Sequence, residues 1–187
     1  MPPITRAVRR LGLNFGAPGD RADDGTLWLA CAEKLDGPVT VRVEADPVRP
    51  FRWHPSRVAG AGPHWVAASG IDGVRKISID LSPADGPPVR YRVGLHFIEP
   101  QSVAAGERVF DIALQGEIAT RGFDIVAKAG AVRRAVPCQF EGIPVRGRLE
   151  IAFLPHAGAK LPYAAVCGLE VRNEADLTTG QSGTAKK

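Results

Sequence analysis

The sequence has no apolar run that approaches the roughly 20 residues of a transmembrane helix, so we expect no membrane insertion. Residues 1–6 also lack the apolar segment of a signal peptide. As the chain stands, this leaves two alternatives: a cytoplasmic protein, or a domain of a longer exported protein.

Cysteine is scarce. Cys31, Cys138 and Cys167 lie far apart, with no C-x-x-C pair and no histidine at zinc-ligand spacing. Cys138 and Cys167 lie in apolar, strand-like segments, where a free cysteine behaves as a small hydrophobic residue. The sequence therefore favours buried thiols, and a single disulfide remains an alternative.

Positive charge is in modest excess, with a formal net charge of +4. Arginine greatly outnumbers lysine, a bias that a GC-rich bacterial genome produces without any functional cause. The arginines are scattered, and Arg9-Arg10 and Arg133-Arg134 are the only doublets. A nucleic-acid-binding protein usually gathers its cations into a stripe, so we expect no nucleic-acid partner.

Helical periodicity is almost absent, and short apolar or alternating runs recur between Gly, Pro and Asp residues. Strands are expected at residues 11–15, 39–45, 65–68, 74–81, 91–97, 109–114, 123–126, 131–140, 149–153 and 164–171. Such a series without intervening helices favours a β-sandwich or barrel. The expected organisation is a basic N-terminal extension (residues 1–10), one domain (residues 11–172) and a disordered polar tail or linker (residues 173–187).

Several motifs occur in a fixed order in the second half. Residues 91–100 (YRVGLHFIEP) end in Phe-x-Glu, and residues 108–116 (RVFDIALQG) follow after a short loop. Residues 123–130, 149–153 (LEIAF) and 167–171 (CGLEV) complete the series, and residues 13–16 (LNFG) supply an N-terminal Asn-x-Gly. Together these motifs resemble the malectin-type carbohydrate-binding domain. The first half is similar, more loosely, to the version found in large bacterial exported proteins.

The resemblance implies an all-β fold, an antiparallel β-sandwich of the jelly-roll (galactose-binding-like) type. It also implies that residues 11–15 lie close to the final strand at residues 164–171. The chain would then be a non-catalytic module within a larger multidomain, extracytoplasmic (periplasmic or secreted) bacterial protein.

The acidic residues of these motifs are expected to be architectural. Asp111 would need a partner if it pointed inward, and Arg108 and Lys76 are the candidates. Asp124 poses the same question. For both acids, fixing loops through backbone N–H groups is favoured over catalysis, and the role of Glu99 in the family is structural.

Sugar-binding proteins stack aromatic side chains on a sugar ring and bind its hydroxyls with polar groups, which on a sandwich come from loops at one end. The candidate carbohydrate-binding residues are Trp28, Trp53, His54, Trp65, Gln101 and Tyr163. Core packing is the competing explanation for the tryptophans. Gln101 and Ser102 stand where the animal malectins have two adjacent aromatic residues, so any sugar would differ from theirs in identity or geometry.

No cofactor is expected, and the alternative is a structural calcium ion bound by Asp20, Asp23 and Asp24. Catalysis is not expected either. Ser69 lacks the G-x-S-x-G setting of a nucleophile, and the spacing of Glu99 and Asp111 gives no sign that the two carboxylates converge.

The sequence thus predicts a carbohydrate-binding module, which should show a concave cleft with an exposed Trp or Tyr face beside acid or amide groups. The alternative is a protein-interaction or assembly module that has lost the glycan site. Such a module should show a contiguous apolar patch or an unpaired sheet edge instead.

Overall fold

The structure, a computed structural model, describes residues 4–37 and 39–179. Its strands are β1 (Arg10–Phe15), β2 (Arg21–Asp23), β3 (Thr26–Cys31), β4 (Lys34–Asp36), β5 (Thr40–Arg52), β6 (Ala59–Gly60), β7 (Ser69–Asp80), β8 (Val89–Phe97), β9 (Val109–Leu114), β10 (Glu117–Asp124), β11 (Arg134–Val145), β12 (Arg148–Pro155) and β13 (Ala164–Asn173). The helices are short: a 3-10 turn η1 (Pro55–Arg57), α1 (His64–Ala67), α2 (Ile125–Ala129) and α3 (Glu174–Thr179).

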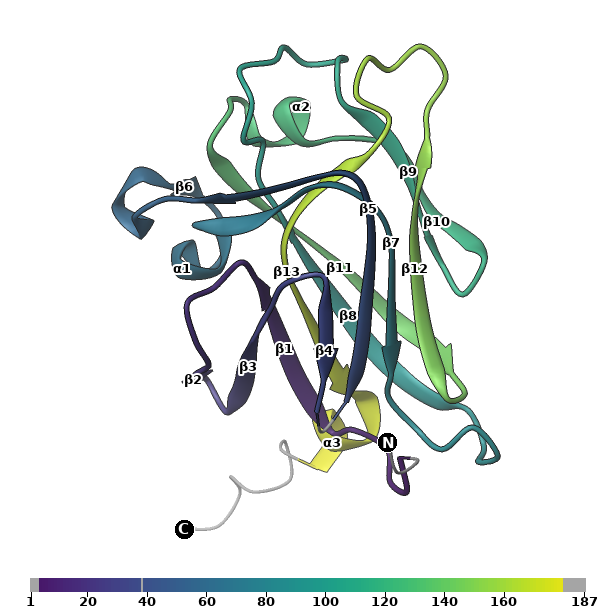
Figure 1. The fold of residues 1–187 in the computed structure, drawn as a ribbon. Coiled ribbons are helices and arrows are strands. Elements are labelled where there is room, and N and C mark those ends of the chain that lie inside the picture. The colour runs from purple at the N-terminus through teal and green to yellow at the C-terminus, as the bar shows by residue number, and fades with distance from the viewer. Residues whose placement is uncertain (1–3, 38, 180–187) are drawn as a thin grey trace, which may run out of the picture.

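The strands form two facing layers (Figure 1). One layer has the order β4-β5-β7-β12-β9-β10, and the other has the order β2-β3-β1-β13-β8-β11. The layers join where the start of β7 pairs with the start of β13, at Ile71 and Val166. Between them, the ring of Phe97 from one layer meets that of Phe123 from the other, with centroids 4.9 Å apart. The predicted all-β sandwich is confirmed.

The pairing of the terminal strands also agrees with the prediction, because Leu11 of β1 lies opposite Val171 of β13. Two pairings differ from an antiparallel sandwich. β1 runs parallel to β3, with Leu13 opposite Leu29, and β6 runs parallel to β11. The sheet is therefore mixed rather than wholly antiparallel.

Two of the expected strands are wrong in part. Residues 65–67 belong to α1 and Ala68 is its C-cap, so this segment is not extended; Pro63 is the N-cap, and its carbonyl accepts the N–H of Val66 at 3.0 Å. Residues 123–126 leave β10 at Asp124, whose Oδ1 accepts the N–H of Ala127 at 2.9 Å and so caps α2. Gly130, with a φ of 81°, ends that helix.

The expected tail begins with ordered residues. Asn173 is the last residue of β13, α3 follows it, and Asp176 forms an ion pair with Arg9 at 2.8 Å. Near the start of the chain, the Tyr91 hydroxyl donates to the carbonyl of Val8 at 2.9 Å, so part of the expected extension packs on the domain. The remaining tail, residues 180–187, lies outside the described residues, and the domain limits stay a prediction.

All three cysteines are free thiols. Cys31 and Cys167 are buried, as expected, and burial raises the pKa of Cys31 to about 12. Cys138 is only half-buried. No helix in residues 4–37 or 39–179 has the length and apolar character needed to cross a membrane.

Candidate functional site

Trp28 lies on the outer face of the second layer, where its indole ring packs directly over Gly12 and Gly168. A Cβ on Gly12, in the neighbouring strand β1, would stand 2.2 Å from Cδ2 of Trp28, so only glycine leaves room for the indole ring. Helix α1 covers the same face, because a Cβ on Gly168 would meet Val66 at 2.5 Å. Trp28 is 5 % exposed and belongs to a small second core. It therefore acts as a packing residue.

Trp65 packs against Trp28. The two indole rings meet edge to face, with centroids 5.3 Å apart and planes at 81°. Trp65 is itself half-buried, in helix α1. Trp53, just after β5, is also half-buried and packs against Phe51 at 5.0 Å. Trp53 and Trp65 both line one cleft, which has a volume of about 410 Å³. We call it the tryptophan cleft.

Polar groups line the same cleft. Oδ1 of Asn14 accepts a hydrogen bond from the Ser69 hydroxyl at 3.2 Å. Oδ1 of Asp20 accepts the N–H of Ala30 at 2.8 Å. In the described part of the chain, the amide nitrogen of Asn14 and Oδ2 of Asp20 have no protein partner. Asn14 and Asp20 thus offer a hydrogen-bond donor and an acceptor to a ligand.

Arginines flank both tryptophan rings. The guanidinium of Arg21 lies 4.5 Å from the ring centroid of Trp65, and that of Arg133 lies 5.6 Å from the ring of Trp53. Arg52 lines the cleft as well. Cation–π contacts at such distances hold the guanidinium groups beside the rings.

His54 lies outside the cleft. Its Nδ1 is 2.7 Å from the Ser56 hydroxyl and accepts the N–H of Ser56 at 3.3 Å, so the side chain caps η1. It borders a second, more open hollow of about 510 Å³, which shares Arg52 and Trp53 with the tryptophan cleft. His54 is therefore close to the candidate site without lining it.

Gln101 and Tyr163 belong to a different part of the molecule. The side-chain amide of Gln101 donates to Asp72 at 2.6 Å, and its backbone N–H donates to Glu99 at 2.9 Å. Tyr163 is buried, its hydroxyl accepts from Arg49 at 3.3 Å, and neither residue lines the tryptophan cleft. The structure therefore does not bring the six predicted binding residues into one site.

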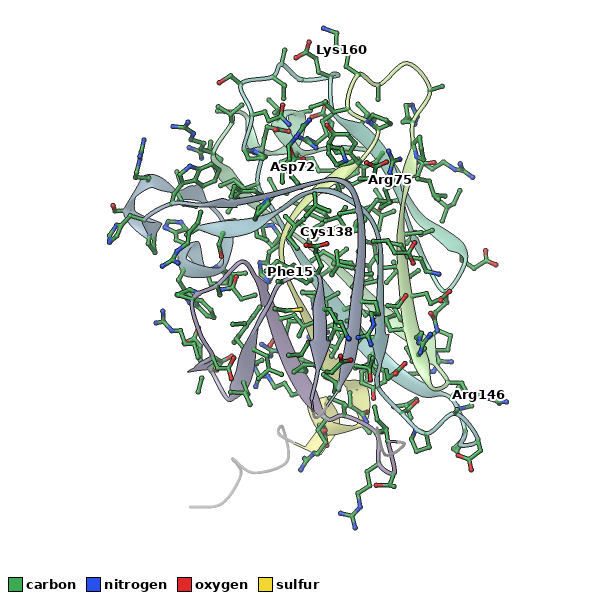
Figure 2. All side chains as sticks on the ribbon, viewed as in Figure 1. Phe15, Asp72, Arg75, Cys138, Arg146 and Lys160 are labelled. Atoms are coloured by element: carbon green, nitrogen blue, oxygen red, sulfur yellow. The ribbon has the colours of Figure 1, made fainter. Side chains whose placement is uncertain are left out.

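Gln101 and Tyr163 both contact a buried ion network near one end of the sandwich. Asp72, a member of this network, is labelled in Figure 2. Nε of Arg108 lies 2.6 Å from Glu99, and its Nη1 lies 2.7 Å from Asp72. Glu99, Arg108 and Asp72 are 0 %, 1 % and 2 % exposed. Burial alone would lower the pKa of Arg108, but its two acidic partners outweigh burial and hold that pKa above the ordinary value. The network ties the loop after β8 to β7 and β9.

Neither of the two possible partners of Asp111 pairs with it, and Asp111 instead lies 3.6 Å from Arg121 and 3.4 Å from His156. Arg108 binds the network above, and Lys76 pairs with Glu150 at 3.0 Å. Asp111 is half-buried and accepts the N–H of Gly122 at 2.7 Å, and this hydrogen bond is the main reason that its pKa is lowered.

Asp124 holds its loop in the same way. Its two oxygens accept the N–H groups of Gly106, at 2.5 Å, and of Ala127. The expectation that these acids bind backbone N–H groups is confirmed: Asp124 fixes a loop, whereas Asp111 binds Gly122 in the irregular part of β10.

The acidic residues proposed for calcium point in different directions. Asp20 caps the N–H of Ala30, whereas Asp24 pairs with Arg10 at 3.1 Å and with Arg172 at 3.6 Å. Among the described residues, no three His, Cys, Asp or Glu side chains converge on a point that could hold a metal ion.

The residues considered for catalysis do not pair either. Ser69 is buried and donates to Asn14, while the exposed His64 places Nε2 3.1 Å from the carbonyl of Gly60. Glu99 is fully buried in the ion network, whereas Asp111 is half-buried on the outer side of β9. No general acid–base pair follows from these positions.

A family model described as Malectin domain matches residues 88–155. This segment is malectin-like. The match covers β8 to β12, including the Phe-x-Glu strand end and the Arg108 motif on which the sequence resemblance depends. The predicted resemblance is confirmed. No curated protein matches the chain.

Several solved structures share the malectin-like fold at low identity. A β-glucuronidase from Bacteroides uniformis has a TM-score of 0.64 at 15 % identity, covering 88 % of this chain and 18 % of that one. A chain in the complex of the plant peptide RALF23 with FER and LLG2 has a TM-score of 0.63 at 20 % identity, covering 88 % and 48 %. The ANX2 ectodomain from Arabidopsis thaliana has a TM-score of 0.62 at 14 % identity, covering 91 % and 54 %. The chain spans between about a fifth and about half of these proteins.

Proposed function

We propose that the chain is a non-catalytic carbohydrate-binding module whose ligand lies in the tryptophan cleft. The observation that carries this proposal is the pair of half-buried indole side chains, Trp53 and Trp65, that line a single cleft beside amide and carboxylate groups. Sugar recognition needs such a combination of aromatic faces with a few polar groups. A volume of about 410 Å³ also lies within the range of small-ligand sites.

The side chains of the cleft have defined roles in this proposal. The parts of the Trp53 and Trp65 indoles that line the cleft contact the C–H groups of a sugar ring. The Asn14 amide donates a hydrogen bond to one hydroxyl, and Oδ2 of Asp20 accepts one from another. Trp28 does not touch the ligand and instead packs edge to face against Trp65.

The malectin likeness supports binding, and the position of the site differs from the one in the animal proteins. Gln101, which stands at the place of a family aromatic residue, is bound to Asp72 and Glu99 within the buried network. The proposed site is therefore next to α1 and η1, and Gln101 does not line it.

The wider setting is part of the proposal. The structural neighbours are longer than this chain, and several are receptor ectodomains. We place the chain as one module of a larger extracytoplasmic protein, with binding as its contribution and without a catalytic centre of its own.

A protein-interaction module is the second candidate, and one observation favours it. β2 lies at the end of its layer with all its residues exposed, and Leu27 on the adjacent strand is 52 % exposed. An open edge of this kind can pair with another chain. If Leu27→Lys abolishes self-association in analytical ultracentrifugation while no glycan binds, the interaction function is supported instead.

Calorimetric titration with neutral glucose-, galactose- and mannose-based oligosaccharides tests the carbohydrate proposal. Trp53→Ala should weaken binding by ~10-fold or more, because it removes one stacking face. Trp53→Phe should retain most of the affinity. Trp28→Ala should lower the free energy of unfolding by about 3–5 kcal/mol, because it empties a packed site.

If no oligosaccharide binds at millimolar concentration while circular dichroism shows a folded protein, the carbohydrate proposal fails. It also fails if Trp53→Ala binds as tightly as the unchanged chain.

A further inference from the structure

Exposed cationic side chains border the tryptophan cleft and the hollows next to it. Arg21 and Arg52 line the cleft, and Arg52 and Arg57 line the open hollow beside it. Lys128 and Arg134 line a third hollow of about 380 Å³. Together with Arg133, which faces Trp53, we call these residues the cationic belt: Arg21, Arg52, Arg57, Lys128, Arg133 and Arg134.

The fold makes the belt continuous. β6 follows η1 and runs beside the start of β11, where Ala59 lies opposite Arg134. The N–H of Ala59 donates to the carbonyl of Arg133 at 3.3 Å. Residues that are about 75 positions apart in the chain therefore meet beside Trp53. In Figure 1, β6 and α1 lie together at one side of the sandwich.

The belt carries positive charge that no nearby acid balances. Within the described part of the chain, none of its members forms an ion pair. Many other exposed cations do: Arg9 pairs with Asp176, Lys34 with Asp36 and Arg148 with Asp80. Among the described residues that line the three hollows, Asp20 is the only carboxylate, and the N–H of Ala30 already occupies one of its oxygens.

Two belt arginines are held where a ligand on the indole rings would meet them. Arg21 lies against Trp65 and Arg133 against Trp53. A guanidinium in a cation–π contact keeps its N–H donors available, because the ring binds it through the face of the group. Arginine then binds a carboxylate or sulfate with two parallel hydrogen bonds, which are stronger than neutral ones.

We propose that the ligand of the tryptophan cleft is an acidic oligosaccharide. Its sugar rings stack on Trp53 and Trp65, while its carboxylate or sulfate groups bind Arg21, Arg52 and Arg133. This inference rests on the carbohydrate-binding function proposed above and adds the chemical class of the sugar.

Matched tetrasaccharides test the inference on the full chain. Each backbone (glucose, galactose or mannose) is used in three forms: neutral, carboxylated at C6 and sulfated at C6. The best charged form should bind ~10-fold or more tightly than its neutral partner, because charge-assisted hydrogen bonds replace neutral ones. The carboxylated and sulfated forms show which anion the belt prefers. Raising the salt from about 0.1 M to 1 M should weaken only the charged forms, because the screening length falls from about 10 Å to about 3 Å.

Charge-removing variants identify the residues. Arg52→Gln and Arg133→Gln should each remove most of the preference for charged glycans over their neutral partners. Arg146→Gln is the matched control. Arg146 is an exposed arginine in the turn between β11 and β12, and Figure 2 shows it at the opposite corner of the molecule from α1 and β6. This variant loses the same charge and should bind like the unchanged chain.

The outcomes separate the two proposals. Equal affinity for neutral and charged forms, with no effect of Arg52→Gln, overturns the acidic-glycan inference and leaves carbohydrate binding intact. The inference is also overturned if Arg146→Gln weakens the binding of charged glycans as much as Arg52→Gln does, because the charge effect is then non-specific. A single-stranded oligonucleotide that displaces the charged glycan and binds more tightly assigns the belt to nucleic acid. If no glycan of any form binds, both proposals fail.

Discussion

Replacement of Arg108 by Met should destabilise the protein severely. The arginine makes charge-assisted hydrogen bonds to Glu99 at 2.6 Å and to Asp72 at 2.7 Å, and it donates to the carbonyl of Tyr163 at 3.1 Å. Arg108→Met fills the space of the side chain but leaves two buried carboxylates without a cation. Breaking a buried ion pair in this way costs about 3–5 kcal/mol. For a domain of this size the melting temperature should fall by about 6–20 °C.

Urea unfolding followed by circular dichroism measures the loss, and calorimetry gives the melting temperature. The control is the triple variant Arg108→Met, Glu99→Gln, Asp72→Asn, which removes both stranded charges. It should recover at least about half of the lost stability, because a neutral buried amide is far less costly than an unpaired buried carboxylate.

A loss under about 1 kcal/mol at pH 7, or a triple variant no more stable than the single one, would refute this account of the network.

Other predictions concern the outer face and the buried titratable groups. Gly12→Ala should lower the free energy of unfolding by about 1–3 kcal/mol in urea titrations, because its Cβ overlaps Trp28. Gly94→Ala on the same face should change it less, since the nearest atom to its Cβ is 3.9 Å away; equal losses would contradict the close fit. Burial lowers the pKa of His96 in the folded protein, so the unfolded chain binds a proton at a higher pH than the folded one. The free energy of unfolding should therefore fall as the pH drops below about 6.5. His96→Gln should reduce this fall between pH 7 and 5. Burial raises the pKa of Cys167, so a thiol reagent at pH 8 should label it only after unfolding, and labelling of the native thiol would show an open path to this side chain.

Much of the sandwich could be predicted from local pattern. The alternation of residues 91–97 and 109–114 places one set of side chains inward, and β8 and β9 follow that pattern. The helices α1 and α2 could not be predicted from periodicity, because four or five residues do not complete two turns. Their capping residues, Pro63 before α1 and Asp124 and Gly130 around α2, are the local signals that would have indicated them.

The candidate site could be predicted only by residue type. Trp28 and Trp53 have the same chemistry, but Trp28 packs on glycine residues and is covered by α1, whereas Trp53 lines an open cleft. Gln101 binds an acid 29 positions away, and that contact removes it from any ligand site. Such differences arise from contacts between distant segments, which alternation along one strand does not encode.

The sequence by itself determined most of the strand pattern, the malectin resemblance, the loop-fixing role of Asp124, and the supply of aromatic and basic residues. The tertiary structure alone decided which tryptophans are exposed and where the arginines gather. Arg21, Arg52 and Arg133 are scattered along the chain, yet their side chains meet around two tryptophans. The physical reason is that burial and electrostatic potential depend on distances in space, which the packing of α1 and the pairing of β6 with β11 set.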